Sequence, residues 1–434
     1  MTFLSDQKTY LSNLGVFKDF LPYQASCYNP YPFVLSHQLA NELMSMASVL
    51  IKGVTAIVEH YLCDQQMQRL MPLPAHLLTY LHLAQGVPYR SGSMRPDLLF
   101  GESGIVKLCE INARFPLNGM TMSQWLADAA AKSSYFNERA YHPAASLNQI
   151  QSQILARFER NKPLVRVATS EKGGESQYFL SLFAQSGAGT INVHPGELCY
   201  QDGAIRYQGR AVEQFLLEID REDLCLFKSA VIEAIITQSN YINDVRTLIL
   251  VHDKRILSLL ANAELMSRYL TEKEWAGLNR FLPQSLDLTD DNVFRQILDS
   301  QNQWVIKKSS GGRGVDLYIG QQCSAEFWQR TLREKRYSYM AQSFVPPGKF
   351  PISLLQNGVF KTQFMHVVGA MPCFDSVCYG PGMFRASQEL CVNVGDGSGH
   401  TIFLTSAIAD KPFRHCASAC QVTRRGEHAL FDPD

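Results

Sequence analysis

Residues 304–320 read WVIKKSSGGRGVDLYIG, and the rest of the chain is organised around this stretch. An apolar run at 304–306 is followed by two lysines, a small-residue loop at 309–314 and an alternating run at 315–319. This pattern predicts a strand, a glycine-rich loop and a second strand. Glycines let the backbone N–H groups approach a ligand closely and lysine supplies a point charge, so the loop suits a polyphosphate. The alternative is an ordinary hairpin with solvated lysines.

The order of these parts differs from three common phosphate loops. A P-loop needs GxxxxGK[ST] and a dinucleotide fingerprint needs GxGxxG, each opening a helix, and neither spacing occurs at 304–320. In a protein-kinase loop the lysine lies on a later strand, whereas Lys307 precedes the glycines. This order resembles the ATP-grasp superfamily, in which a strand lysine and a glycine-rich hairpin close over the phosphates of ATP.

Composition narrows the partners. The 434 residues favour two or three interlocked subdomains. A formal net charge of +0 gives no electrostatic case for nucleic acid or an anionic membrane as the main partner. No run reaches the roughly 18 apolar residues of a membrane span, and the first residues lack the pattern of a signal peptide. We therefore predict a cytoplasmic protein, and the sequence leaves an oligomer open.

The cysteines add little to this picture. Eleven are scattered without a repeating framework, which suits a reducing compartment. His415, Cys416 and Cys420 form a cluster, but no fourth ligand stands at the spacing of a zinc site. The sequence leaves open whether they bind anything.

A second motif lies at 94–112, MRPDLLFGESGIVKLCEIN. Two apolar runs flank a glycine-bounded turn, which predicts a hairpin. Asp97, Glu110 and Asn112 stand at the outer ends of the two strands, and these ends lie side by side in a hairpin. Glu110 and Asn112 lie two residues apart, so their side chains share one face of the strand. Convergent oxygen ligands suit Mg²⁺. Surface charge at the strand ends is the alternative.

The remaining segments predict an α/β arrangement. Ser36 is the expected N-cap of a first long helix. A strand, helix and strand at 164–193 predict a parallel βαβ unit, and the loop 169–174 at its carboxyl edge is a candidate site for a second substrate. Lys254 stands in the first turn of a helix, where the dipole disfavours a cation, so it has either an anionic partner or solvent around it. Helices are predicted at 36–62, 77–83, 211–219 and 224–237, and an apolar strand followed by a helix is predicted within 243–260. A hairpin is predicted at 197–209 and a strand at 339–345. The segments 360–375 and 380–387 are predicted to form antiparallel strands.

Taken together, the motifs resemble the glutathionylspermidine synthetase branch of the ATP-grasp superfamily, with glutathione synthetase as a more distant relative. MRPD and CEIN resemble its RxD and ExN elements, and HDKRILSLL, VIKKSSGGRG, YMAQSFVPPGKF and GPGMFRAS resemble its nucleotide-binding elements in the same order. The resemblance implies that Arg95 contacts the reacting phosphoryl or acyl oxygen and that Asp97, Glu110 and Asn112 hold Mg²⁺. The residues that it places on ATP are Lys254, Lys307, Ser309, Gly311, Gly312, Gly314, Gln342 and Arg385.

The implied fold is α/β (α+β), with two ATP-grasp lobes gripping ATP. The expected segments are an N-terminal helical region (1–90), the metal-ligand hairpin and its connection (91–150), a substrate subdomain (151–245) and the nucleotide-binding lobes (246–434). Lys308 replaces the family's proline, and Ala113, Arg114, Phe115 and Pro116 replace its D-T-P-T, so the resemblance does not identify the substrate. Arg114 is either a fork for a substrate carboxylate or an exposed loop arginine.

The function implied is an ATP- and Mg²⁺-dependent ligase that joins a carboxylate to an amine through an acyl phosphate. The substrates would be small amino acids, peptides or polyamines. A phosphotransferase of the same fold and a non-catalytic nucleotide-binding scaffold are the alternatives, because one fold hosts many chemistries.

Overall fold

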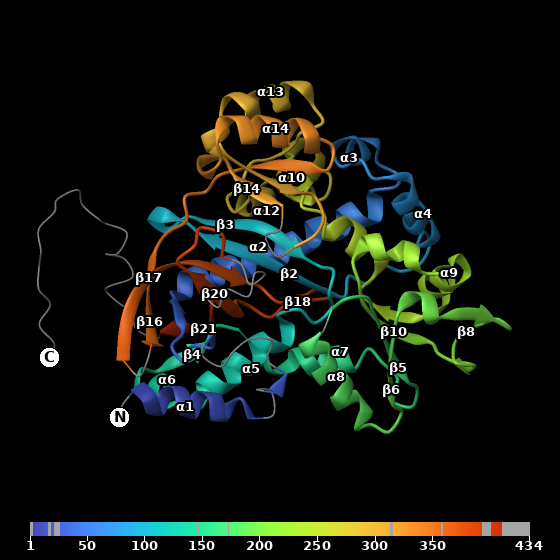
Figure 1. The fold of residues 1–434 in the computed structure, drawn as a ribbon, viewed down its shortest axis with the longest axis horizontal. Helices are drawn as coiled ribbons and strands as arrows, with labels where there is room; N and C mark the ends of the chain where they lie inside the picture. Colours follow the sequence, from blue (N-terminus) through green and yellow to red (C-terminus); the bar gives the residue numbers. More distant parts are fainter. Residues whose placement is uncertain are drawn as a thin grey trace, which may run out of the picture.

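A computed structural model describes residues 3–15, 19–20, 27–145, 147–171, 173–312, 316–356, 359–392 and 401–409. Helices and strands are mixed around a large central sheet (Figure 1). An upper lobe carries α13 (Asp291–Asp299) and α14 (Ala325–Lys335), whereas α1 (Phe3–Asn13), α5 (Met120–Ala131) and α6 (Ser134–Glu138) lie below the sheet. The predicted mixed class and N-terminal helical segment are confirmed.

The central sheet joins segments from both ends of the chain and has ten strands among the described residues. Its β2 (Ser93–Phe100) and β3 (Val106–Asn112) form the predicted hairpin, and β2 pairs antiparallel with β17 (Val359–Ala370). The predicted antiparallel pairing of β17 with β20 (Met383–Ser387) is also confirmed. The other strands are β1 (Phe33–Leu35), β4 (Tyr141–Pro143), β16 (Phe350–Gln356), β18 (Cys373–Phe374), β19 (Val377–Cys378) and β21 (Ile402–Ala409).

Helices cover both faces of this sheet. α2 (His37–His60) begins at the predicted N-cap, where Ser36 Oγ accepts a hydrogen bond from Leu39 N at 3.1 Å, and its apolar stripe enters the core. Among the described residues it alone is long and apolar enough to cross a membrane, and half of its most apolar window is buried in the protein. On the opposite face, Trp125 of α5 packs with Met383. Helices that surround α2 are α3 (Gln65–Leu70), α4 (Ala75–Leu83), α10 (Ile256–Ala261), α11 (Ala263–Met266) and α12 (Glu272–Asn279).

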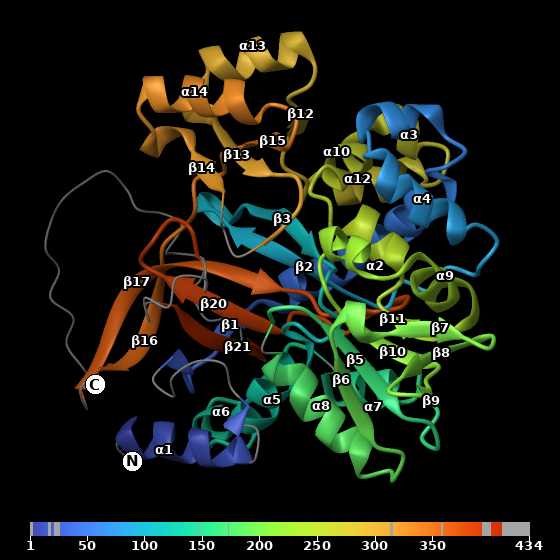
Figure 2. The same cartoon turned by 45° about the vertical axis from the view of Figure 1, so that its right-hand side comes forward.

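A second sheet is parallel and has the order β11, β10, β5, β6. β5 (Leu164–Ala168), α8 (Gly174–Ala184) and β6 (Thr190–Val193) form the predicted βαβ unit. A small sheet at the right of Figure 2 contains the hairpin predicted at 197–209, with its turn at Asp202. The remaining elements of this region are α7 (Ile150–Leu155), β7 (Cys199–Gln201), β8 (Ala204–Tyr207), β9 (Arg210–Ala211), β10 (Gln214–Glu218), α9 (Ser229–Gln238) and β11 (Asn240–Ile242).

Two sequence predictions in this region were wrong. Residues 211–219, predicted as a helix, contain β10, whose five residues are all buried between β5 and β11. Leu and Glu favour helices, but a strand buried on both faces lacks the two-residue alternation that would identify it. The apolar run 247–251, predicted as a strand, forms a buried π-helical turn, η7 (Thr247–Val251), before α10. A short buried run does not distinguish strand from helix by its periodicity.

The upper lobe contains an antiparallel sheet with the order β12 (Ser285–Asp287), β15 (Tyr339–Ser343), β13 (Trp304–Lys308), β14 (Leu317–Ile319). The hairpin predicted from 304–320 is confirmed, because Lys307 of β13 pairs with Leu317 of β14. Trp304 and Ile306 pack with α14 in the core of this lobe. Because side chains alternate along a strand, Val305 and Lys307 face the other way, toward β3.

We expect Gly320→Ala to destabilise the upper lobe. The added Cβ would lie 1.9 Å from the carbonyl oxygen of Gln301 and 3.0 Å from that of Trp304. Overpacking of this kind costs about 1–3 kcal/mol, and occasionally more. Gly277→Ala in α12 is the matched control, because its Cβ meets nothing within 4 Å and alanine favours a helix by about 1 kcal/mol. Thermal melting should show opposite shifts, and an unchanged melting temperature for Gly320→Ala would contradict this packing.

Candidate active site

A cavity of about 560 Å³ lies where the upper-lobe sheet, the β2–β3 hairpin and the carboxyl end of the parallel sheet meet. Ser309 and Gly311 lie next to Lys254, which lines this cavity. The Ser309 carbonyl accepts a hydrogen bond from the backbone N–H of Lys254, and the Gly311 carbonyl accepts one from its Nζ. Gly314 lies outside the described residues, as do His415, Cys416 and Cys420. The predicted site residues that line the cavity are Arg95, Asp97, Glu110, Asn112, Lys254, Lys307, Gly312, Gln342 and Arg385.

The hairpin brings the three predicted metal-binding side chains together. Asp97 lies opposite Glu110 in the register of β2 and β3, with a bulge directly after Asp97. Asn112, two residues along the strand, donates its Nδ2–H to Asp97 Oδ2 at 3.0 Å and to Glu110 Oε1 at 3.1 Å. One amide therefore bridges two carboxylates at the open end of the hairpin.

Asp97 also holds two arginines. Arg95 donates to it through Nε at 2.8 Å and Nη2 at 3.0 Å, and Arg385 through Nη2 at 2.6 Å. Because Arg95 Nη1 donates to both the carbonyl and the side-chain oxygen of Asn118, four of its five N–H groups are used. Arg385 donates to no other described residue, so its remaining N–H groups are available to an anion.

Two lysines flank Glu110. Lys254 Nζ lies 3.4 Å from Glu110 Oε2, and Lys307 is buried and donates to the Cys109 carbonyl at 3.0 Å. Burial lowers the pKa of Lys307. Burial alone would raise the pKa of Glu110, but the charges of Lys254 and Lys307 outweigh it and hold that pKa below its usual value. The carboxylate is therefore ionised between two cations.

The chemistry of the donor set fits Mg²⁺, which prefers one or two carboxylates completed by the phosphates of a substrate. Glu110 and Asn112 are half-buried and line the cavity, whereas Asp97 is 1% exposed and both of its oxygens accept hydrogen bonds from arginines. In the part of the chain that the structure describes, no group of three or more His, Cys, Asp or Glu side chains is placed to hold a metal. A metal at this cluster would therefore also need the Asn112 amide oxygen.

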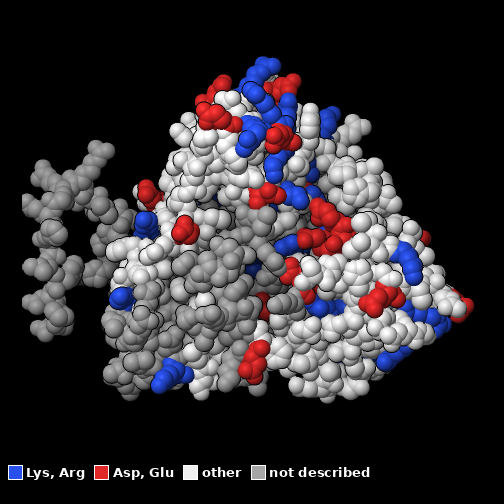
Figure 3. Space-filling view, in the orientation of Figure 1, with Lys and Arg blue, Asp and Glu red and all other residues white. Residues whose placement is uncertain are grey.

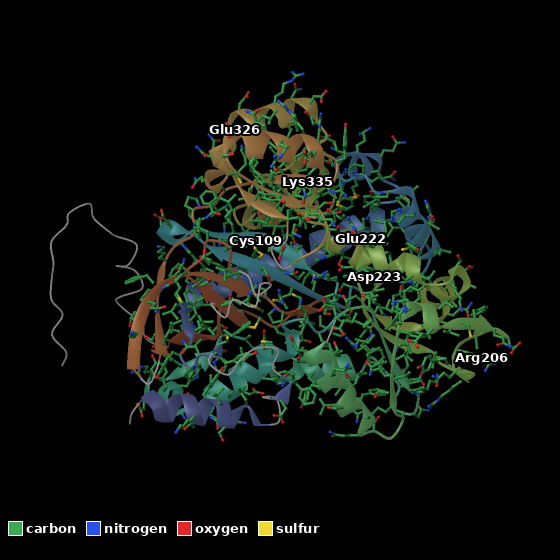
Figure 4. All side chains as sticks on the ribbon, viewed as in Figure 1. Cys109, Arg206, Glu222, Asp223, Glu326 and Lys335 are labelled. Carbon is green, nitrogen blue, oxygen red and sulfur yellow. The ribbon has the colours of Figure 1, made fainter. Side chains whose placement is uncertain are left out.

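The start of the glycine loop is docked onto neighbouring elements. Ser310 Oγ donates to Glu222 Oε1 at 2.8 Å, on the 3₁₀ turn η6 (Arg221–Leu226). Gly312 lies against Arg114, because a Cβ there would be 3.1 Å from its Nη2. Figure 4 shows Cys109 and Glu222 at the level where the upper lobe meets the rest of the molecule. Charged side chains of both signs gather along the same seam and over the upper lobe (Figure 3).

Arg114 is a buried cavity residue rather than an exposed loop arginine. It is 8% exposed, its Nη1 donates to Asp220 Oδ2 at 2.5 Å, and its guanidinium lies 4.3 Å from the centre of the Phe115 ring. The Nε and Nη2 atoms of Arg114 donate to no described residue, so one edge of its guanidinium group has no hydrogen-bond partner among the described residues. The loop predicted to take a second substrate lines the same cavity through Ser170, Glu171, Gly173 and Gly174.

Two cavity residues escaped the sequence interpretation. Asn118 anchors Arg95, and Glu175 accepts hydrogen bonds from Gly119 N at 2.6 Å and Met122 N at 2.8 Å at the start of α5. Burial raises the pKa of Glu175, against the effect of these hydrogen bonds. Asn118 and Glu175 each form hydrogen bonds with residues more than twenty positions away in the sequence. No local sequence pattern indicates such contacts.

Comparisons with known proteins bear on the fold that positions this cavity. A family model described as the AnkG N-terminal domain matches residues 46–250. Over 418 residues the chain is 22% identical to the ATP-grasp enzyme ankG of Aspergillus thermomutatus, covering 83% of this chain and 85% of that protein. The solved structure of a glutathione synthetase-like effector from Globodera pallida matches 94% of this chain and 96% of its own, with a TM-score of 0.57 at 10% identity. The chain therefore has an ATP-grasp fold of the glutathione synthetase-like kind, as its motifs predicted.

Proposed function

We propose that this protein is an ATP- and Mg²⁺-dependent ligase that joins a carboxylate to an amine and releases ADP and phosphate. The observation that carries the proposal is one cavity bounded by two kinds of wall. One wall holds Glu110, Lys254 and Lys307, which suit a nucleoside triphosphate with its Mg²⁺. The other wall is formed by Ser170, Glu171, Gly173 and Gly174 of a separate sheet. Nucleotide binding needs only the first wall, whereas a ligase also needs room for its substrates.

The reaction would proceed in two displacements. A substrate carboxylate oxygen attacks the γ-phosphorus, and the bond to the β,γ-bridging oxygen breaks so that ADP leaves. Lys254 and Lys307 neutralise the charge of the phosphates, while the unpaired donors of Arg385 and the remaining N–H of Arg95 stabilise the equatorial oxygens. The amine nitrogen then attacks the acyl carbon, the bond from that carbon to the phosphate oxygen breaks, and the amine loses a proton.

Glu110 and Asn112, together with Asp97, would hold Mg²⁺, and the ion would supply neutralising charge next to the phosphates. Asp97 has a second task in this scheme, because it orients Arg95 and Arg385. The glycine loop that starts at Ser309 would exclude water from the acyl phosphate.

The substrate side of the cavity supports a small substrate that carries a carboxylate. The unused edge of the Arg114 guanidinium suits a bidentate contact with a carboxylate, which favours an amino acid or peptide. The same cavity must also admit an amine, such as that of an amino acid or polyamine. A cytoplasmic location remains a prediction from the sequence.

Incubation of the protein with ATP, Mg²⁺, a mixture of amino acids and hydroxylamine tests this function. We expect ADP together with amino acid hydroxamates, because hydroxylamine captures an acyl phosphate. A phosphorylated product without hydroxamate would instead indicate a phosphotransferase. Nucleotide binding without turnover in any mixture would indicate a scaffold, and either outcome would contradict the proposal.

A further inference from the structure

The face of the upper-lobe sheet that lines the cavity has an apolar end and a charged end. Ile319, Val305 and Gln342 are successive partners in the register across β14, β13 and β15, so their side chains form one row. Lys307 lies two residues further along β13, in the next row, and reaches β3. The flat apolar surface of the first row suits a nucleobase, and the lysine row suits the phosphates. Gln342 therefore stands at the base end.

A chain of hydrogen bonds fixes the side-chain amide of Gln342. Its Nε2 donates to Ser285 Oγ at 3.2 Å, and Ser285 Oγ donates to the carbonyl oxygen of Pro283 at 3.1 Å. Ser285 is the neighbour of Gln342 in the register of β12 and β15, and both residues are buried. A hydroxyl has a single proton. Because Ser285 donates that proton to the Pro283 carbonyl, its oxygen acts only as an acceptor toward Gln342.

The opposite orientation of the amide would leave a buried carbonyl without a partner. If Gln342 turned Oε1 toward Ser285, the Ser285 hydroxyl would have to donate its proton to Oε1 and give up its hydrogen bond to the Pro283 carbonyl. That carbonyl accepts a hydrogen bond from no other described side chain. A buried polar group that loses its partner is destabilising. The favoured orientation therefore keeps Nε2 on Ser285 and leaves Oε1, which accepts from no described residue, for the cavity.

We propose that Ser285 is a positioning residue that gives the nucleotide site its selectivity for a purine with an amino group at C6. This inference rests on the proposed nucleotide-dependent function. Position 6 of adenine carries a hydrogen-bond donor and that of guanine an acceptor. The Gln342 oxygen therefore accepts from adenine, whereas it would face the oxygen of guanine without a proton between them.

The test is the ratio of the dissociation constants of two non-hydrolysable nucleotides, GMP-PNP and AMP-PNP, measured with Mg²⁺ by calorimetry. We expect the wild-type protein to prefer AMP-PNP, and Ser285→Ala to lower the ratio by about tenfold, since one hydrogen bond to a buried group is at stake. Ser285→Thr keeps the hydroxyl and should keep the ratio. Gln342→Met should lower the ratio as Ser285→Ala does, and the double variant should add nothing, because Ser285 acts through Gln342.

The outcomes separate this inference from the function on which it rests. AMP-PNP binding with an unchanged ratio in Ser285→Ala, measured on a protein with a wild-type melting temperature, would overturn the role of Ser285 alone. Equal losses in Ser285→Ala and Ser285→Thr would also overturn it, because the hydroxyl would then not matter. A wild-type protein that binds neither nucleotide would overturn both the inference and the proposed function.

Discussion

Glu110→Gln is expected to reduce ATP turnover by more than about 100-fold. The substitution keeps the size of the side chain and removes its charge. Lys254, whose Nζ lies 3.4 Å from Glu110 Oε2, and the buried Lys307 then lose the negative charge that balances their own charges. The proposed Mg²⁺ loses its most exposed carboxylate ligand. Initial rates of ADP formation over a range of Mg²⁺ concentrations measure both effects.

The matched control for this variant is Glu102→Gln, in the exposed turn of the same hairpin. It removes the same charge from the same motif, and we expect wild-type turnover. A cooperative melting transition in Glu110→Gln would show that the fold is retained, since Glu110 is half-buried and not part of the apolar core. Normal turnover in Glu110→Gln would rule out the assignment of a metal to this cluster.

Lys307→Met is expected to weaken nucleotide binding by about 10- to 100-fold, since a hydrogen bond to a charged group contributes about 1.5–3 kcal/mol. Lys307 is 6% exposed, and its amine is held on the Cys109 carbonyl in the cavity wall. Methionine fills a similar volume, so the loss should come from the missing charge. Titration with AMP-PNP in the presence of Mg²⁺ measures the change.

Lys361→Met, an exposed strand lysine on β17, is the control for this substitution, and we expect unchanged affinity. The phosphate assignment also predicts a difference between ligands. Adenosine, which has no phosphates, should bind Lys307→Met and the wild-type protein alike. An AMP-PNP affinity equal to that of wild type would contradict the assignment of Lys307 to the phosphates.

The hairpins at the site were predictable from the sequence because their local signals agree. Glycines mark the turn between β2 and β3, and the apolar runs on either side predict strands. The convergence of Asp97 with Glu110 and Asn112 follows from that hairpin alone. The glycine loop between an apolar run and an alternating run similarly predicted that β13 and β14 would pair.

Two other segments that are buried on all sides were not predicted correctly. All five residues of 214–218 and all five of 247–251 are buried, yet the first segment forms β10 and the second a π-helical turn. Their neighbours in space decided between the two, because β10 lies between two parallel strands. Periodicity carries no information when every side of a segment is covered.

The electrostatic organisation of the site also lay beyond the sequence. A motif predicted that Arg95 acts on the substrate, but the structure commits most of its donors to Asp97 and Asn118. Arg385, some 290 positions later, carries the unpaired donors. Such a division of roles depends on which side chains meet across the central sheet, and this follows from the pairing of β17 with β2 and β20.

The central claim is that a carboxylate is activated as an acyl phosphate, and the transfer of oxygen to phosphate tests it most directly. Amino acids labelled with ¹⁸O in their carboxyl groups would be supplied with ATP, Mg²⁺ and the protein, and the released phosphate examined by mass spectrometry. We predict that phosphate formed together with an amide product carries one ¹⁸O atom from the carboxylate. Amide product accompanied by unlabelled phosphate would contradict the proposed mechanism.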